Sequence, residues 1–277
     1  MKPAPFAYIR PASLDDALRL LAGAGESMPI AGGQSLVPLL ALRMSSPERL
    51  IDIGRLDALR KVAENATSVT IGAGITHAEI EDGHVPDPAN GLMRRIAGGI
   101  AYRAIRNQGT IGGSVALADP AADWPSCLTA LRATVRIVGP NGERTMLVTE
   151  LIEGVFATAL GRGELIVGFD IPKLPPAARV GFAKVARKTG AFAMSLAIVV
   201  VDGGTARIVL GGAGTRPLML SSTAQAFTAV DAVDAVDGSL RAAIAHDLDA
   251  IHTEVDAYAR RLHTATILRA IAEARVS

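Results

Sequence analysis

Residues 107–123 read Asn-Gln-Gly-Thr-Ile-Gly-Gly-Ser-Val-Ala-Leu-Ala-Asp-Pro-Ala-Ala-Asp, and they are the most informative stretch of this chain. Three glycines, a threonine and a serine lie within residues 109–114, and Asp119 and Asp123 follow them. Glycines let the backbone approach a ligand closely, so that successive N–H groups converge on an anion. An aspartate placed after such a loop can accept a hydrogen bond from a ribose hydroxyl. The stretch therefore suits a phosphate-bearing nucleotide, although taken alone it also suits a simple turn.

A second glycine loop lies near the N-terminus. Residues 31–36 read Ala-Gly-Gly-Gln-Ser-Leu, between apolar residues 28–30 and an apolar run at 37–42. This order predicts a strand, a loop and a helix, with Ser35 as the N-cap. The N-terminus of a helix carries free N–H groups and partial positive charge, so this loop is a second candidate phosphate site. The alternative is a tight turn followed by a capped helix.

Two common nucleotide-binding motifs are absent. Neither loop contains Gly-x-Gly-x-x-Gly, and although Gly72-Ala73-Gly74 follows a strand-like run, His77 stands where the third glycine belongs. The phosphate-loop motif Gly-x-x-x-x-Gly-Lys-Ser/Thr does not occur. The sequence therefore disfavours the Rossmann and P-loop folds.

Composition narrows the class of protein further. The chain has 277 residues, a net charge of +1 and 20% charged residues, which favours two modest domains and no nucleic-acid partner. No apolar run approaches the roughly 20 residues of a membrane helix, so we expect no membrane span. The first residues lack the apolar core of a signal peptide, and we expect a cytoplasmic location.

The single cysteine and the histidines argue against metal or thiol chemistry in this chain. Cys127 cannot form a disulfide within the chain or an all-cysteine iron–sulfur cluster, and its apolar helical surroundings favour a buried structural thiol. The five histidines include no His-Glu-x-x-His arrangement, so we predict no metal site and no catalytic residue.

Sequence patterns place elements along the whole chain. We predict helices at 14–24 (capped by Ser13), from residue 78, at 90–105, 123–132 and 252–275, and strands at 50–53, 134–138, 144–148, 165–171, 180–187, 193–201 and 205–211. Three prolines within residues 172–176 mark a boundary. We expect an α+β fold with domains at 1–175, subdivided near residue 55, and at 176–277.

Together these motifs resemble a known family. Residues 31–35, 72–77 and 106–114 with 118–123 are similar to the FAD-binding medium subunit of the xanthine dehydrogenase and carbon monoxide dehydrogenase family of molybdenum hydroxylases. The resemblance continues through residues 183–193 and 211–217 and covers essentially the whole chain. It implies a two-part FAD-binding domain of the vanillyl-alcohol-oxidase or PCMH type, followed by a smaller α+β C-terminal domain.

The resemblance also implies a function. The chain would bind FAD non-covalently and act as the electron-transfer subunit of an oxidoreductase. A large partner subunit with the molybdenum cofactor would oxidise the substrate, and a small partner subunit would relay electrons through two [2Fe–2S] clusters to the FAD. The flavin would then pass them to an external acceptor. The expected assembly is a doubled heterotrimer.

The same resemblance assigns cofactor-binding residues. They are Ala31, Gly32, Gly33, Gln34, Ser35, Leu36, Thr76, Ile100, Thr110, Ile111, Gly112, Gly113, Ser114, Asp123, Ile166, Lys184 and Phe192. Residues 31–35 and 110–114 would wrap the pyrophosphate with backbone and hydroxyl donors, and Asp123 would accept from a ribose hydroxyl.

The remaining assigned residues each have a structural alternative. Thr76 and Ile100 would line the cofactor, and Ile166 and Lys184 would lie along the flavin. Thr76 also suits a helix cap, Ile100 and Ile166 suit an apolar core, and Lys184 suits a solvated strand position. Arg94, Arg95, Arg103 and Arg106 form a cluster that suits a phosphate, a solvated face or a subunit contact.

One departure from the family concerns the flavin side. Relatives with a Gly-Asp-Tyr-Ala motif carry an aromatic hydroxyl near the isoalloxazine, whereas this chain has Gly-Ala-Phe-Ala at residues 190–193. Phe192 keeps a ring for stacking but has no phenol. We therefore expect acceptor access or flavin potential to differ from those relatives, unless Phe192 is a core residue in a strand.

Two other functions remain open from the sequence. One is a free-standing FAD-dependent reductase of the same fold, such as the enolpyruvyl-UDP-N-acetylglucosamine reductases. The other is an assembly subunit that has lost its flavin, against which the glycines of both loops and Asp123 argue. The sequence identifies neither the substrate of the complex nor its electron acceptor.

Overall fold

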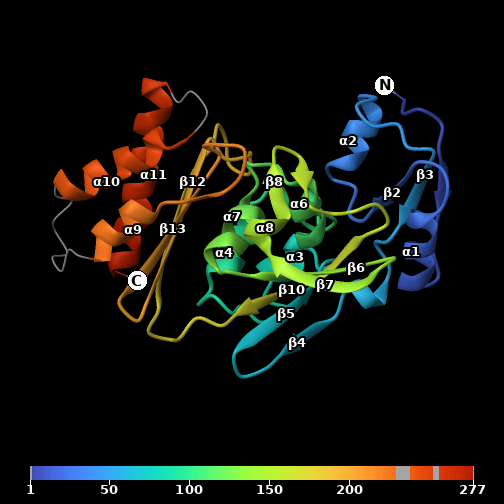
Figure 1. The fold of residues 1–277 in the computed structure, drawn as a ribbon, viewed down its shortest axis with the longest axis horizontal. Helices are drawn as coiled ribbons and strands as arrows, with labels where there is room; N and C mark the ends of the chain where they lie inside the picture. Colours follow the sequence, from blue (N-terminus) through green and yellow to red (C-terminus); the bar gives the residue numbers. More distant parts are fainter. Residues whose placement is uncertain (1, 229–237, 252–255, 277) are drawn as a thin grey trace.

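The computed structural model describes residues 2–228, 238–251 and 256–276. Three β-sheets follow one another along its longest axis, from the N-terminal part on the right of Figure 1 to the C-terminal helices on the left. One parallel sheet and two larger antiparallel sheets, each with its own helices, make up the α+β fold predicted from the sequence. Among the described residues, no helix combines the length and the hydrophobicity that a bilayer crossing requires.

The N-terminal sheet has three parallel strands in the order β1-β3-β2. Its elements are β1 (Ala7–Ile9), α1 (Leu14–Ala22), β2 (Ser27–Ile30), α2 (Leu36–Ala41) and β3 (Arg49–Asp52). As predicted, the Ser13 side chain caps α1 by accepting from the N–H of Asp16. The parallel arrangement means that β2 ends at the same sheet edge as β3, and the first glycine loop leaves from that edge.

The middle sheet has five antiparallel strands in the order β4-β5-β10-β6-β7. Its strands are β4 (Val62–Glu64), β5 (Ser68–Gly72), β6 (Thr134–Gly139), β7 (Gly142–Leu147) and β10 (Leu165–Pro172), and β8 (Ile152–Gly154) pairs separately with β9 (Ala157–Thr158). The helical elements of this part are η1 (Asp57–Leu59), α3 (His77–Glu81), α4 (Leu92–Gly98), α5 (Arg103–Arg106), α6 (Ile111–Leu117), α7 (Asp123–Ala130) and α8 (Val148–Leu151). The predicted hairpin of β6 and β7 is confirmed.

The single long helix predicted at 90–105 is wrong. The chain instead forms α4 and α5, separated by a turn at residues 99–102. Gly98 and Gly99 weaken a helix by about 1 kcal/mol each relative to alanine. Ala101 then adopts a left-handed conformation with φ of 46°, which ends the helical path.

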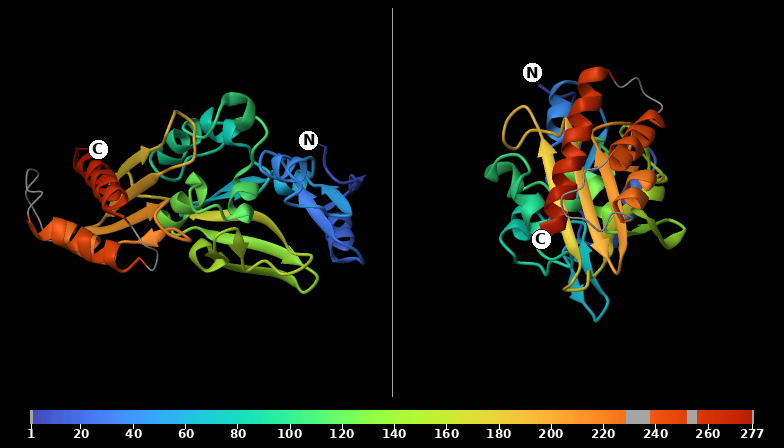
Figure 2. Two further views of the ribbon diagram at one scale, coloured as in Figure 1. Left: turned by 90° about the horizontal axis from the view of Figure 1, so that it is seen from above. Right: turned by 90° about the vertical axis from the view of Figure 1, so that its left-hand side faces the viewer.

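The C-terminal sheet is antiparallel, in the order β11-β12-β13-β14. Its elements are β11 (Arg179–Val185), β12 (Ser195–Asp202), β13 (Thr205–Gly211), β14 (Leu218–Met219), α9 (Ser221–Thr228), α10 (Gly238–Asp249) and α11 (Ala257–Val276). The helices cover one face of this sheet, and α11 crosses it in the right-hand view of Figure 2. The first residues of the helix predicted at 252–275 lie outside the described residues.

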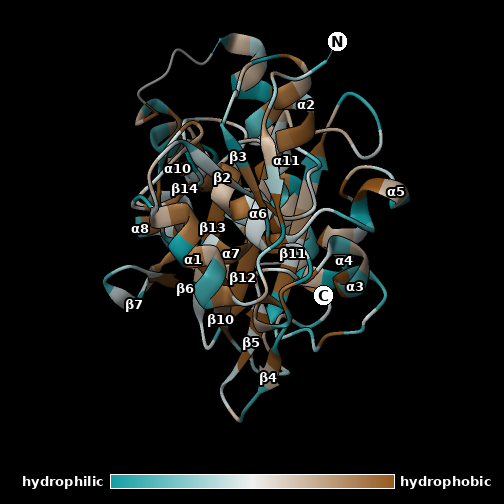
Figure 3. Ribbon diagram, turned by 90° about the vertical axis from the view of Figure 1, so that its right-hand side faces the viewer, coloured by the Kyte–Doolittle hydropathy of each residue, from teal (hydrophilic) through white to brown (hydrophobic). Residues whose placement is uncertain are grey.

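Strand β12 is buried on both faces, which explains its uninterrupted apolar sequence. Ile198 and Val200 pack against the core of the middle sheet, whereas Ala197 and Val199 pack against the C-terminal helices. In Figure 3 the central strands are mainly hydrophobic and many surface loops are hydrophilic. The C-terminal part is therefore joined to the middle part through a shared apolar core.

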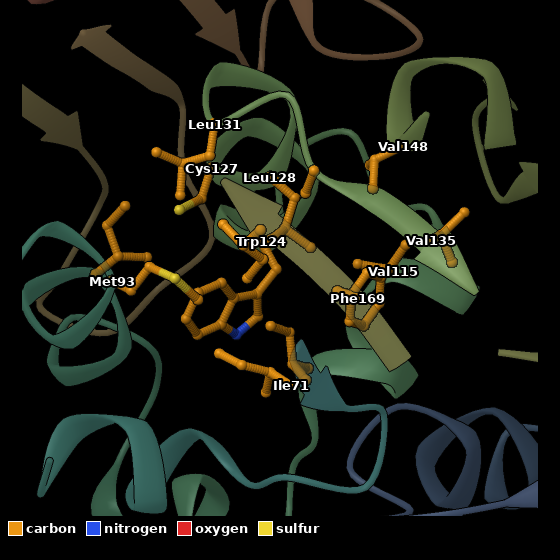
Figure 4. Close-up of a cluster of buried hydrophobic side chains, with 14 of the residues drawn as sticks. Ile71, Met93, Val115, Trp124, Cys127, Leu128, Leu131, Val135, Val148 and Phe169 are labelled. Carbon is orange, nitrogen blue, oxygen red and sulfur yellow. The ribbon is translucent and has the colours of Figure 1, made fainter. Parts of the chain in front are cut away.

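The middle core is built around Trp124, which is fully buried with Met93, Ile71 and Phe169 (Figure 4). Cys127 lies in the same cluster with no exposed surface, as predicted, and burial raises the pKa of its thiol. The residue directly before Trp124 is Asp123, so the packing of the indole fixes the position of that carboxylate.

Candidate functional site

The first glycine loop leads from β2 into α2 and presents free amide groups. None of the five N–H groups of residues 32–36 donates to an acceptor in the part of the chain that the structure describes. Ser35 stands at the N-cap of α2, as predicted, but its side chain makes no capping hydrogen bond, so the hydroxyl remains available. Successive unpaired N–H groups of this kind are what an anionic group requires.

Gly32 brings the two glycine loops into contact. A Cβ at this position would overlap the carbonyl oxygen of Gln108 and would lie 2.9 Å from the Cα of Gly109. Only glycine permits this close approach of two backbones. The loop at 31–36 therefore packs directly on the residues that precede Thr110.

The second glycine stretch is the start of helix α6 rather than an open loop. The Thr110 side chain caps the helix by accepting from the N–H of Gly113 at 3.0 Å. The N–H groups of Ile111 and Gly112 donate to Ile75 and Ala73 at 3.0 and 2.9 Å. The structure thus does not leave these amides free to wrap a pyrophosphate. The N–H of Ser114 also donates, to the carbonyl oxygen of Thr110, so the hydroxyl is the donor that Ser114 has left.

Asp123 and Lys184 form a buried ion pair between the middle and C-terminal sheets. The Lys184 Nζ donates to Asp123 Oδ2 at 2.8 Å, and the side chains are only 12% and 5% exposed. The interpretation of Lys184 as a solvated strand residue is therefore wrong. Burial raises the pKa of the Asp123 carboxyl, and Lys184 opposes that shift.

The second oxygen of this carboxylate lacks a partner. Asp123 Oδ1 is buried and accepts no hydrogen bond from the residues that the structure describes. A buried acceptor without a donor costs about 1–3 kcal/mol, so such groups often mark a place where a ligand donates. A ribose hydroxyl is a donor of the kind that this oxygen needs.

The other assigned residues serve partly structural roles. Thr76 forms a capping box with Glu79, as its alternative predicted, and it also pairs with Thr110 through a β-bridge. Ile166 is buried in the core of the middle sheet, and Ile100 is partly buried against it. Phe192 is 60% exposed, so its interpretation as a core residue is wrong.

A cavity of about 590 Å³ opens beside both loops. Ala31, Gly32, Thr76 and Thr110 line it, so the structure brings these four assigned residues together. The other assigned residues do not line it: Asp123 begins α7, Ile166 and Lys184 lie on β10 and β11, and Phe192 lies in the loop after β11.

The arginines near the site are paired within the chain. Arg103 binds Glu81 and Asp82, and Arg106 binds Glu81 at 2.7 Å. Arg95 pairs with Glu273, and Arg94 donates to the carbonyl oxygen of Glu81 at 2.8 Å. These contacts account for the cluster through interactions inside the protein.

Sequence reasoning missed a buried hydrogen bond between Trp124 and His77. The Trp124 Nε1–H donates to His77 Nδ1 at 3.0 Å, and the backbone N–H of His77 donates to Gly109 at 2.9 Å. Burial, assisted by the charge of Arg106, lowers the pKa of His77 to about 4. The neutral imidazole of His77 thus links two chain segments: His77 directly follows Thr76, and its partner Trp124 directly follows Asp123. The signal in the sequence was that His77 and Trp124 each directly follow an assigned residue.

This arrangement predicts acid sensitivity. His77 is neutral in the folded state down to a pKa of about 4 but takes up a proton near pH 6.5 when unfolded. The stability that the neutral His77 contributes is therefore fully present above pH 6.5. As the pH falls from 6.5 to 4, the free energy of unfolding should decrease by about 3 kcal/mol. Urea unfolding at several pH values should show this loss in the parent chain and not in His77→Asn. His84→Asn, at an exposed histidine, is the matched control.

Comparison with known proteins identifies the family of this chain. The family model for the FAD binding domain in molybdopterin dehydrogenase matches residues 4–174. The chain is 36% identical over 222 residues to the glyceraldehyde dehydrogenase medium chain of Sulfolobus acidocaldarius. The aligned region covers 78% of this chain and 79% of that protein. It is 40% identical over 223 residues to the 6-hydroxypseudooxynicotine dehydrogenase complex subunit alpha of Paenarthrobacter nicotinovorans, covering 78% and 75%. In the structure of the carbon monoxide dehydrogenase from Hydrogenophaga pseudoflava that lacks the Mo-pyranopterin moiety, one chain matches with a TM-score of 0.91 and 30% identity, covering 100% of this chain and 99% of that one.

The fold and the family match define a protein with an FAD-binding domain. The chain belongs to the family of FAD-binding medium subunits of molybdenum hydroxylases. It is an oxidoreductase subunit whose FAD serves electron transfer.

Proposed function

We propose that residues 32–36 hold the pyrophosphate of FAD with their backbone N–H groups, and that Ser35, Thr110 and Ser114 add hydroxyl donors. The observation that carries this proposal is the run of five successive amides without an acceptor among the described residues. The contact of Gly32 with Gln108 supports it, because that contact holds the two glycine segments against each other.

The adjoining residues then have separate tasks toward the cofactor. Asp123 accepts a ribose hydroxyl at Oδ1 while Lys184 holds Oδ2, and Thr76 and Ile100 shield the cofactor from water. Ile166 supports them from the core of the middle sheet. Once bound, FAD supplies the redox chemistry, and the chain itself needs no general base. Its residues bind the cofactor, orient it and leave one edge accessible to an electron acceptor.

The proposed assembly follows from the family. We propose a heterotrimer, present in two copies, in which this chain joins a small [2Fe–2S] subunit and a large molybdenum subunit in the cytoplasm. Residues 1–175 would form the FAD-binding domain, subdivided near residue 55, and residues 176–277 the C-terminal domain. Electrons would pass from the iron–sulfur clusters to FAD and then to an external acceptor.

The first test is the absorption spectrum of the chain purified alone, followed by heat release and chromatography of any bound cofactor. We expect about one FAD per chain, because the residues proposed to hold the pyrophosphate all belong to this chain. A colourless chain that takes up added FAD in a titration would still support the site. A colourless chain that binds no added FAD would contradict it and would favour a flavin-less assembly subunit.

A further inference from the structure

A second cavity, of about 290 Å³, lies where the middle part of the chain meets the C-terminal sheet. Its lining residues come from the C-terminal end of α7 and the turn after it, the end of β7, the start of α8, and the strands β13 and β14. It shares no lining residue with the cavity beside the glycine loops. The arrangement proposed for FAD therefore makes no use of it.

Two arginines line this cavity without a carboxylate partner. Neither Arg132 nor Arg207 forms an ion pair with the residues that the structure describes. Arg207 Nε donates to the carbonyl oxygen of Ala130 at 3.0 Å, which leaves its two terminal nitrogens without an acceptor in that same part of the chain. Burial and the charge of Arg132 lower the pKa of Arg207, and Asp202 only partly opposes that shift. The cavity thus holds two neighbouring cations that no ion pair neutralises.

A buried hydroxyl without a partner lines the same cavity. Thr129 is 2% exposed, and its Oγ1 makes no hydrogen bond with the described residues. Buried polar atoms nearly always have a partner, so an exception needs an explanation such as a bound ligand. Because Thr129 lines the cavity together with both arginines, a ligand that fills it meets all three donor groups.

The ordinary needs of a helix end do not account for both arginines. Cations are favourable at the C-terminus of α7, and Arg207 already supplies one that binds a terminal carbonyl oxygen. Arg132 follows that end with φ of 55°, while the N–H of Ala133 donates to the carbonyl oxygen of Leu128 at 2.9 Å. Glycine is the usual residue at such a position, because it adopts a positive φ without strain. The backbone role of residue 132 therefore does not explain why an arginine stands there.

Most of the remaining lining is apolar. Apart from Thr149, it consists of Leu128, Ala133, Leu147, Val148 and Met219. Leu147 is 36% exposed and Met219 is 46% exposed, so the apolar part of the lining reaches the surface of the chain. The volume lies at the lower end of the range of about 300–1,000 Å³ that small-molecule sites occupy. A ligand of this site is therefore small and has an apolar part.

We propose that this cavity binds a small organic anion. Its carboxylate or phosphate group accepts hydrogen bonds from the two arginines and from the hydroxyl of Thr129. Its short apolar body packs on Leu147 and Met219. Guanidinium groups suit both kinds of oxyanion, because their N–H groups donate in a fixed fork that matches two oxygens. One negatively charged head also relieves the repulsion between two cations that lie close together.

The test titrates the full chain with three probes that share one ring, in a buffer without other carboxylates or phosphates. Benzoate and phenyl phosphate carry the two kinds of head group, and benzyl alcohol carries none. Calorimetry should show saturable binding of at least one of the two anions and no binding of benzyl alcohol. The anion that binds more tightly identifies the head group that the site prefers.

Three variants place the bound anion. Arg132→Met and Arg207→Met should each weaken binding of the tighter anion by about tenfold, because each removes a charge-assisted contact. Thr129→Val should weaken it by about threefold, since a neutral hydroxyl contributes less. Arg132→Met breaks no side-chain hydrogen bond of the described chain, so it serves as the test if Arg207→Met fails to fold. Arg241→Met, at an exposed arginine of α10, is the matched control.

The outcomes are independent of the proposed function. If neither anion binds, or if Arg132→Met and Thr129→Val bind the anion as tightly as the parent chain does, the site is overturned. A chain that takes up benzoate or phenyl phosphate in this arginine-dependent way but binds no FAD would support the anion site and contradict the FAD site. The reverse result would leave the FAD site intact and overturn this one.

Discussion

Replacement of Gly32 by alanine is expected to lower FAD affinity at least tenfold, equivalent to about 1.4 kcal/mol, and to destabilise the chain. The added methyl group would overlap the carbonyl oxygen of Gln108, and backbone atoms cannot turn aside as a side chain does. Overpacking of this kind costs about 1–3 kcal/mol. The loop at 31–36 must therefore move away from Thr110, and the free amides move with it. Fluorescence titration with FAD and urea unfolding measure the two effects.

The matched control is Gly154→Ala. A Cβ at Gly154 meets no atom within 4 Å, and its φ is outside the left-handed range, so the same substitution should change neither FAD affinity nor unfolding. If Gly32→Ala binds FAD as tightly as Gly154→Ala does, the contact between the two glycine segments does not organise the site.

Much of the fold was accessible from the sequence because its patterns are local. Ser13 before an amphipathic run, the hairpin at 134–147 and the apolar strands after residue 180 were all confirmed. The break between α4 and α5 was not predicted. It depends on Ala101 in a left-handed conformation, which Arg106 and Gly190 stabilise from outside the helix. The residue type at position 101 does not predict such a conformation.

The sequence pointed to segments that the structure brings together, but it did not predict the hydrogen bonds that their backbone groups make. The spacing of the second glycine stretch suggested an open loop, whereas Thr110 caps a helix there and the amides of Ile111 and Gly112 donate to the segment that follows β5. Gly112 is required because a Cβ would lie 2.5 Å from the Cβ of Ala73. A pattern of small residues shows that backbones approach closely, but it does not say whether the neighbour is a ligand or the protein.

The second large effect is expected at the buried ion pair. Lys184→Met should lower the free energy of unfolding by about 3 kcal/mol, because it leaves the Asp123 carboxylate buried without a compensating charge. Burial already raises the pKa of Asp123, and loss of Lys184 raises it further. The folded variant then binds a proton that the unfolded chain releases, so the deficit should shrink as the pH is lowered toward the ordinary aspartate pKa of about 3.9.

The control variants test whether the loss of stability comes from the ion pair or from one of its two side chains alone. Lys61→Met, at an exposed lysine, should leave unfolding unchanged. Asp123→Asn with Lys184→Met should cost less than the two single changes added together, because the double variant leaves no unpaired charge in the interior. If Lys184→Met unfolds at the same urea concentration as the parent at neutral pH, the two side chains are not paired in solution. FAD affinity measured on Asp123→Asn and on a further variant, Asp123→Ala, then tests whether the cofactor contacts this carboxylate. Asparagine retains one carbonyl oxygen, so affinity that survives in Asp123→Asn but falls in Asp123→Ala supports such a contact, as expected for the oxygen that has no partner among the described residues.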